Sequence, residues 1–458
     1  MRSKTLRLVL CLLISGLGER MLLSAQTSGP PVQMTPPQSS ATKTTGPPQS
    51  LTVQDAEALG LKNNPQISVS RLLALASHQV IREAKSSYYP TLSGNLTGVG
   101  ADQGSRIAAG NLNNPIVYER AAGGLTLSQL ITDFGRTNNL VASAALRAKA
   151  TDMNAAATAA QIRLAVDQAF YNALQTAALL KVAEQTVSTR QVVADQITTL
   201  YQNKLRSQLD VSFADANLAQ AKLLLLDAQN NQQAALSALS EILGYSSQQN
   251  FVLVDTEGVA APPPDNADQL VDEAFSNRPE ISAQTYEYQA AQHMQKAERD
   301  LLFPSVEALG VTGRTPLGSD ITSGVPAFGS WYGAIGVNVN IPVFNGFLYP
   351  ARSKEAALRA QAEEQQLRDL KDRIANDVRT SWLTASTAYR RISVTKQFVD
   401  QTNLAVDLSQ TRYNLGLGSI VELSQAQLQQ TEAQIQYAAA KYQYQIAQAV
   451  LRFQIAAP

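Results

Sequence analysis

The chain has 458 residues and balances 37 acidic residues against 37 basic ones, so no net charge attracts it to nucleic acid or to an anionic membrane surface. Charged residues make up only 16% of the chain, and small or uncharged polar residues take their place, which suits long helices packed side by side. The two histidines, His78 and His293, have no partner at metal-ligand spacing, and the chain has no phosphate-binding loop and no nucleophile motif. We therefore expect neither an enzyme nor a cofactor.

Residues 1–25 predict an export signal, because three basic residues precede the apolar run 8–17 and a passable cleavage site precedes Gln26. The run is too short to span ~30 Å of hydrocarbon, which disfavours the alternative of a membrane anchor. Cys11, the only cysteine, follows Leu10 where a lipoprotein motif requires a small residue, so we do not expect lipidation. Residues 26–50 are rich in Pro, Ser, Thr and Gly and predict a disordered lead-in.

A first repeat is expected over residues 51–247. It opens with a helix over 51–61, the Asn64-Pro65 turn and a second helix over 65–86. Two strands follow, at about 88–100 and 122–134, with a Gly/Asn-rich loop over 100–114 between them. Apolar and polar residues alternate from Thr91 to Thr97, which predicts strands with one apolar and one polar face.

The most informative feature is a long run without glycine or proline. Such a run covers 136–200, and a shorter one returns over 208–243 after a brief turn. Sixty-odd helical residues span on the order of 90–100 Å. Apolar residues recur at coiled-coil spacing within both runs, so we expect a long helical hairpin.

The same order of elements repeats in the second half of the chain. After a linker at 248–266, the second repeat covers 267–457, with strands at about 303–314 and 331–345, a long helix over 351–412 and a return helix over 420–457. Pro65 corresponds to Pro279 at an offset of 214 residues, and Tyr201 corresponds to Tyr413 at an offset of 212. Register kept across such unlike segments indicates a duplication.

The strands constrain how the chain can be used. No later segment has ~20 continuous apolar residues, so we expect no transmembrane helix. Four strands are too few for a barrel, which needs about eight, and an open sheet in lipid leaves its edges unsatisfied. Other subunits are therefore expected to complete the sheet. The alternative is a non-pore periplasmic or secreted coiled-coil scaffold whose β-hairpins cap helical hairpins.

Five motifs accompany the duplicated order of elements: Asn64-Pro65, Arg278-Pro279, 133–136, 341–346 and 412–419. With this order and these motifs, the chain resembles the TolC family of outer-membrane efflux proteins. The resemblance implies a mainly α fold with a transmembrane β-barrel: a homotrimer with one twelve-stranded barrel in the cell outer membrane and an α-helical tunnel in the periplasm. It implies a periplasmic adaptor (membrane fusion protein) and an inner-membrane pump as partners, and no nucleic acid. The transported substrate (drug, metal or protein) stays open.

The resemblance also places a periplasmic aperture at the two hairpin tips. A latch tyrosine corresponds to Tyr413, its aspartate partner to Asp210 and an acid of the constricting ring to Glu422. Gly418 and Gln425 depart from the family pattern, which implies a looser latch and a less negative ring. The tip residues expected to contact the adaptor are Lys204, Leu205, Arg206, Gly416, Leu417 and Gly418.

Elementary electrostatics gives the acids two possible roles. Threefold symmetry would gather three copies of Glu422 and Asp210 around one axis, and such a ring favours cations. Alternatively, both acids merely start helices, where negative charge is favoured by the helix dipole.

Overall fold

The computed structural model describes residues 49–100, 120–255, 261–264, 266–319, 326–327 and 330–457. The expected export signal, nearly all of the lead-in and of the loop over 100–114, and parts of the linker lie outside these residues. The chain divides into Met1–Pro47 and a second unit, Pro48–Pro458, and the description below concerns the second unit.

The first repeat begins with short helices and caps that its sequence specifies. Thr52 and Asp55 form a capping box at the first helix, and Asn64 caps the next, where Pro65 occupies the first helical position. The elements of this half are β1 (Gln49–Leu51), α2 (Val53–Asn63), α3 (Pro65–Lys85), a 3-10 turn (Ser86–Tyr88), β2 (Thr91–Val99), β3 (Arg120–Thr132), α4 (Arg136–Gln202), α5 (Gln208–Ile242) and β4 (Phe251–Leu253).

The second repeat has the same order, so the duplicated fold is confirmed. Its elements are α6 (Ala267–Asn277), α7 (Pro279–Asp300), β5 (Ser305–Ser319), β6 (Pro326–Ala327), β7 (Ser330–Asn340), α8 (Leu348–Asn414) and α9 (Ile420–Gln454). Helices α4 and α8 both have 67 residues, and α5 and α9 both have 35. All four helix ends are shifted by the same offset, for example 348 − 136 = 212.

Several expected bounds need correction. The strand expected at 88–100 begins only at Thr91, because a 3-10 turn precedes Pro90. The strand expected at 331–345 ends at Asn340, shortly before Pro342, which has no N–H for the ladder. The strand expected at 303–314 covers Ser305–Ser319, and the one at 122–134 covers Arg120–Thr132. The long helix expected over 351–412 extends at both ends, to Leu348 and Asn414, and the return helix over 420–457 ends at Gln454.

The linker expected at 248–266 also contains a strand. β4 pairs in parallel with β1, with Leu51 opposite Leu253. This small sheet joins the start of the first repeat to the segment that connects the two repeats.

The four long strands form one antiparallel sheet in the order β2-β3-β5-β7, with β6 paired to the far part of β5. Pairs such as Leu92↔Leu127 and Gly310↔Ile335 place apolar residues on one face. That face is open in the single chain, where Leu96 is 93% and Ile335 94% exposed. Among the described residues, β2 and β7 each have one edge without a partner strand.

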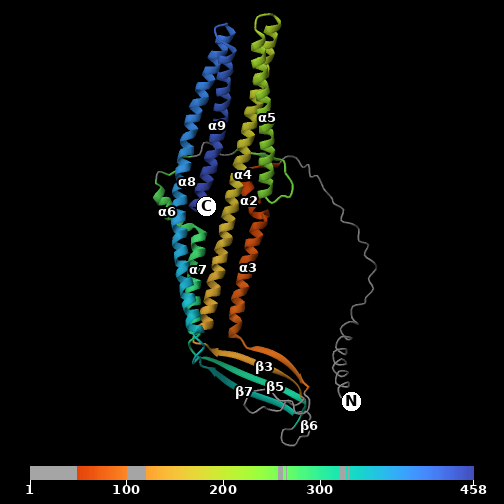
Figure 1. Cartoon of the computed structure of the whole chain (residues 1–458), viewed down its shortest axis with the longest axis vertical. Helices are drawn as coiled ribbons and strands as arrows, with labels where there is room; N and C mark the ends of the chain where they lie inside the picture. Colours follow the sequence, from red (N-terminus) through yellow and green to blue (C-terminus); the bar gives the residue numbers. More distant parts are fainter. Residues whose placement is uncertain are drawn as a thin grey trace, which may run out of the picture. The chain divides into compact units, whose positions relative to one another are not determined.

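Figure 1 shows the sheet at one end of the long helices and the hairpin tips at the other. Helix α4 packs on α3, α5, α7 and α9, and α8 packs on α6, α7 and α9. Three buried clusters follow the bundle: one around Phe170 and Tyr171, one around Val378, and one at the tips that includes Tyr413. None of the described helices combines the length and apolar character needed to cross a membrane.

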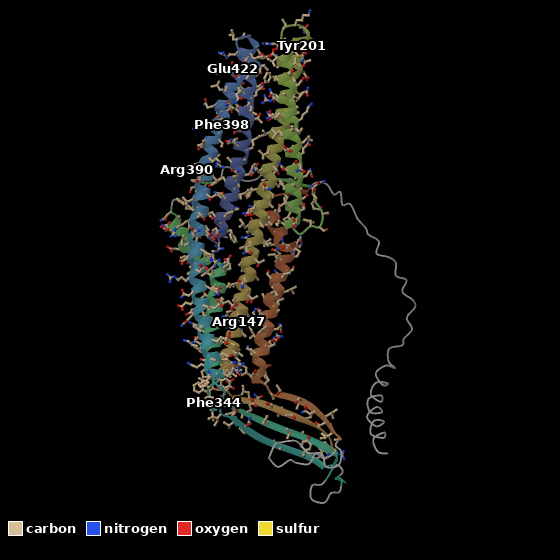
Figure 2. All side chains as sticks on the ribbon, in the orientation of Figure 1. Arg147, Tyr201, Phe344, Arg390, Phe398 and Glu422 are labelled. Carbon is tan, nitrogen blue, oxygen red and sulfur yellow. The ribbon has the colours of Figure 1, made fainter. Side chains whose placement is uncertain are left out.

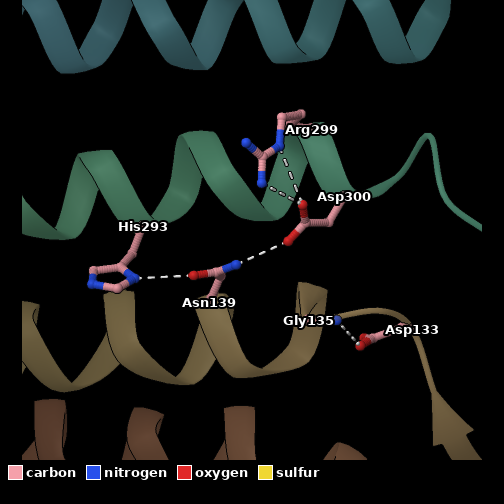
Figure 3. A network of polar contacts seen from close by, with 6 residues as sticks. All are labelled: Asp133, Gly135, Asn139, His293, Arg299 and Asp300. Carbon is pink, nitrogen blue, oxygen red and sulfur yellow. Dashed lines mark hydrogen bonds and ion pairs between the residues drawn. The ribbon is translucent and has the colours of Figure 1, made fainter.

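A polar network ties the start of α4 to the end of α7, close to the sheet (Figure 3). The Asn139 amide donates to Asp300 at 2.9 Å and accepts from the His293 ring at 3.1 Å. Burial and then the charge of Lys296 lower the pKa of His293, which keeps the ring neutral at pH 7. The Asp133 carboxylate accepts from the backbone N–H of Gly135 at 3.2 Å and so holds the strand-to-helix turn. His293 therefore has a structural role in this junction.

Candidate functional site at the hairpin tips

The two tips reverse the chain with the same backbone motif. The N–H of Leu205 donates to the Leu200 carbonyl at 2.9 Å, and the N–H of Leu417 donates to the Arg412 carbonyl at 2.8 Å. Each turn needs one left-handed residue, which is Lys204 (φ 61°) in the first tip and Gly416 (φ 74°) in the second. These two residues correspond under the offset of 212. Figure 2 labels Tyr201 and Glu422 at this end of the bundle.

The predicted acids occupy the same position in their helices but have different partners. Asp210 closes a capping box, in which its carboxylate accepts from the N–H of Ser207 at 3.0 Å. Glu422 donates its N–H to the Ser419 hydroxyl, while its carboxylate forms an ion pair with Arg412 at 3.3 Å. The Asp210 side chain thus caps the start of its own helix, which is the second of the two roles considered above. The Glu422 side chain instead connects the two helices of its hairpin.

Tyr413 is the buried centre of the tips. Its side chain is only 3% exposed and lies in the third cluster; the other buried members are Ala194, Ile197, Val211, Ala214, Leu218, Ile420 and Leu423. Burial raises the pKa of Tyr413, the charge of Asp210 raises it further, and Arg206 opposes both. The ring therefore stays a neutral phenol at pH 7.

The contact that covers Tyr413 comes from the other hairpin. The Arg206 guanidinium carbon lies 4.0 Å from the centroid of the tyrosine ring, and Arg206 also donates to the Tyr413 carbonyl at 2.6 Å. Among the described residues, the Tyr413 hydroxyl has no hydrogen-bond partner. Asp210 is close enough to affect the tyrosine electrostatically, yet no hydrogen bond joins the two.

The structure therefore brings Tyr413 and Asp210 together but assigns the direct contact to Arg206. Sequence reasoning gave Arg206 a role only in contacting the adaptor, and no spacing pattern predicts that a lone arginine in a loop covers a buried tyrosine. It also did not single out Arg412, the partner of Glu422, or Arg190, a buried arginine further along α4.

The remaining tip residues are mainly exposed. Leu205 and Leu417 are 68% and 69% exposed, so each tip presents a leucine to its surroundings. Gly418 is confined, because a Cβ there would lie 3.2 Å from both the Arg412 Cβ and a Glu422 carboxylate oxygen. A side chain at position 418 would therefore require Arg412 or Glu422 to shift by a few tenths of an ångström.

Comparison with known proteins identifies relatives over almost the whole described chain. The family model described as "Outer membrane efflux protein" matches residues 58–245 and again 270–457. The outer membrane efflux protein BepC of Brucella suis biovar 1 (strain 1330) is 21% identical over 362 residues, which is 78% of this chain and 75% of BepC. The outer membrane protein TolC of Escherichia coli (strain K12) is 23% identical over 379 residues, 80% of this chain and 74% of TolC. A solved structure of CusC superimposes with a TM-score of 0.75 at 20% identity, covering 88% of this chain and 91% of CusC.

Proposed function

Because the chain belongs to the outer membrane efflux protein family, we propose that three copies assemble into one passive exit duct. Membership makes the protein an outer-membrane channel that works within an efflux system, with its helices in the periplasm. The proposal adds the trimer, a periplasmic adaptor and an inner-membrane pump that supplies both substrate and energy.

The observation that carries the proposal is the pair of open sheet edges. A chain with four long strands, β2, β3, β5 and β7, leaves one edge of β2 and one of β7 without partners among the described residues. In lipid such edges must be paired, and β7 of one copy can pair with β2 of the next. Three copies would give a closed barrel of about twelve strands, an even number within the range for such barrels. The apolar face would then meet lipid, and the polar face, with Asn95 and Asn338, would line the duct.

The helices support the same ring. Exposed apolar side chains follow α3 and α5 on one edge of the chain and α8 on the other. On α3 and α5 they include Leu72, Leu73, Leu209, Phe213 and Leu223, and on α8 Leu358, Val394, Leu404 and Leu408. Because the two edges differ, they would meet head to tail, and such contacts close into a ring when the rotation allows it.

Within this duct we assign the periplasmic opening to the hairpin tips. Asp210, Tyr413 and Glu422 would line or latch the aperture, and the exposed tip residues around Leu205 and Leu417 would meet the adaptor. Arg412 partly neutralises Glu422 in the same chain, so the ring would be less negative than three free carboxylates. Widening the aperture by moving the hairpins apart would require the contact between Arg206 and Tyr413 to break.

The test is conductance of the detergent-purified full-length protein across a planar lipid bilayer. We expect discrete steps that prefer cations, and a weaker preference in Glu422→Ala. Glu364→Ala removes an exposed acid on α8, remote from the tips, and should leave selectivity unchanged. If Glu422→Ala leaves the conductance steps and their selectivity unchanged, the duct is supported, but its constriction lies at residues other than Glu422. A protein that stays soluble and never inserts would refute the duct and favour the scaffold.

A further inference from the structure

Arg190 is a buried arginine on α4 without a carboxylate partner in the described chain. Its side chain is 8% exposed and lies on the buried stripe of α4 that includes Thr186, Ala194 and Ile197. Among the described residues its one hydrogen bond is long, from Nη2 to the Thr431 hydroxyl at 3.4 Å. Burial lowers the pKa of Arg190 to about 10, so the guanidinium is still cationic at neutral pH.

A comparison within the chain shows that this arrangement is unusual. Arg278, the other arginine with comparable burial among the described residues, forms an ion pair with Glu280 at 3.0 Å and donates to Gln454 at 2.7 Å. A buried charge without a counter-ion is unfavourable, because it has lost its hydration without gaining a partner. An anion that reached Arg190 would therefore be bound favourably.

Helix packing does not require a charge at this position. Under the offset of 212, Arg190 corresponds to Thr402 of the second hairpin, which is equally buried (5% exposed). The Thr402 hydroxyl is satisfied within its own helix, on the Phe398 carbonyl at 2.9 Å. A small neutral side chain therefore serves in the second copy, and the arginine of the first copy needs another explanation.

Arg190 lines a groove between α5 and α9, with α4 contributing the guanidinium. The groove has a volume of about 520 Å³ and extends along α9 from Ser424 to Gln436, on the order of 18 Å at 1.5 Å per residue. Its apolar lining comes from Ala221, Leu224, Leu428 and Ile435. A hydrogen bond of 2.8 Å from Asn217 to Ser424 bridges α5 and α9 at the end nearer the tips.

We propose that this groove binds an alkyl monocarboxylate, with the carboxylate paired to the Arg190 guanidinium and the alkyl chain along Leu224, Leu428 and Ile435. A guanidinium matches a carboxylate with two parallel hydrogen bonds. The volume lies in the range of small-molecule sites, which are mostly apolar with a few fixed polar groups. Glu432, the only carboxylate among the described residues of the lining, forms no ion pair with Arg190 and so leaves the guanidinium available.

The occupant is better described as a free ligand than as a side chain of a partner helix. The guanidinium lies below the surface between helices, and a helix about 10 Å wide cannot follow it into the gap between two packed neighbours. An alkyl chain is one carbon wide and can lie lengthwise in the groove. The inference does not rest on the proposed duct, because binding can be measured without conductance.

The experiment is a calorimetric titration of the full-length protein, purified in a non-ionic sugar detergent, with decanoate and with decanol. We expect decanoate to bind more tightly than decanol, and Arg190→Met to weaken decanoate on the order of tenfold, the worth of one charge-assisted pair. Arg190→Lys should keep most of the affinity. Arg390→Met, which removes an exposed arginine of α8 (Figure 2), is the matched control and should leave binding unchanged.

Three results would overturn the proposal. One is equal affinity of wild type and Arg190→Met for decanoate, and another is equal affinity of wild type for decanoate and decanol. The third is the absence of decanoate binding to the wild type. In that case the anion that pairs with Arg190 would be an acidic side chain of a partner protein. If Arg190→Met fails to fold, Leu428→Gln provides a second test at an exposed position of the lining, where several-fold weaker binding is expected.

Discussion

The two helical hairpins have identical lengths, yet their tips are not equivalent. Tyr201 and Tyr413 correspond under the offset of 212, but Tyr201 is 40% exposed and Tyr413 only 3%. One difference is that the third cluster buries Tyr413 and does not include Tyr201, and a second lies in another corresponding pair, Arg206 and Gly418. Arg206 of the first tip stacks on Tyr413, whereas Gly418 has no side chain with which to cover Tyr201. The two tips share one backbone conformation, but their side chains differ: the first tip supplies the arginine, Arg206, that covers the tyrosine of the second tip, Tyr413.

The long helices α4 and α8 also differ in which corresponding residues they bury. Asp167 of α4 is 5% exposed, while the corresponding Arg379 of α8 lies at the surface and pairs with Asp268 at 3.1 Å. The first hairpin therefore buries a titratable carboxyl group at a position where the second hairpin has a solvent-exposed arginine. The two copies therefore differ both at the hairpin tips and along the long helices.

The largest loss of stability expected from a single substitution comes from removing the covered tyrosine, Tyr413. Tyr413→Ala deletes a fully buried ring from the tip cluster and should destabilise the tip by about 3 kcal/mol, as for other buried aromatic residues. The matched change Tyr201→Ala should cost less than about 1 kcal/mol, because that ring is partly exposed. Thermal melting followed by circular dichroism, together with limited proteolysis at the tips, measures both. Equal losses in the two variants would show that the tips are equivalent after all.

A pH-dependent effect is expected at the buried aspartate of α4. Burial raises the pKa of Asp167 from 3.8 to about 7, the charge of Glu57 adds to the shift, and Arg452 and Arg163 oppose it. The native carboxyl then keeps its proton up to about pH 7, while the unfolded chain releases it near pH 3.8. The stabilisation is complete below pH 3.8 and is lost as the pH rises to about 7, by at most about 1.4 kcal/mol per pH unit for one proton.

Asp167→Asn should remove this slope and raise the melting temperature at pH 8 relative to the wild type. The comparison is Asp268→Asn, which removes the exposed acid that pairs with Arg379 in the second repeat and should leave the slope in place. Melting curves between pH 4 and 8 give the result. A slope that survives in Asp167→Asn would assign the pH dependence to other groups.

The sequence was sufficient for the parts of the fold that depend on periodicity. The runs 136–200 and 351–412 contain no glycine or proline, and apolar and polar residues alternate in β2 and β7. Both signals are local, the offset of 212 repeats them in the second copy, and the structure has these elements close to where they were expected. The pairing of β1 with β4 was not predicted, because strands of three residues are too short to show a pattern.

The candidate site was less accessible to sequence reasoning. Arg206 and Tyr413 are 207 residues apart, and only the packing of the two hairpins brings them into contact. One signal was available: Ser207 stands three residues before Asp210, the spacing of a capping box, and that motif explains the hydrogen bonds of this carboxylate. Whether these residues form a gate stays a prediction.

The smallest expected effect concerns the left-handed residue that both turns require. Lys204 adopts φ 61° with a side chain, whereas Gly416 reaches φ 74° without one. Lys204→Gly should relieve about 1 kcal/mol of backbone strain, partly offset by the greater freedom of glycine in the unfolded chain. Gly416→Ala should cost about 1 kcal/mol for the same reason, and no atom lies close enough to a new Cβ to add a clash. A higher melting temperature for Lys204→Gly and a lower one for Gly416→Ala would show that both turns require the left-handed conformation at this position. A gain of stability in Gly416→Ala would contradict this and show that the second tip does not need the left-handed conformation.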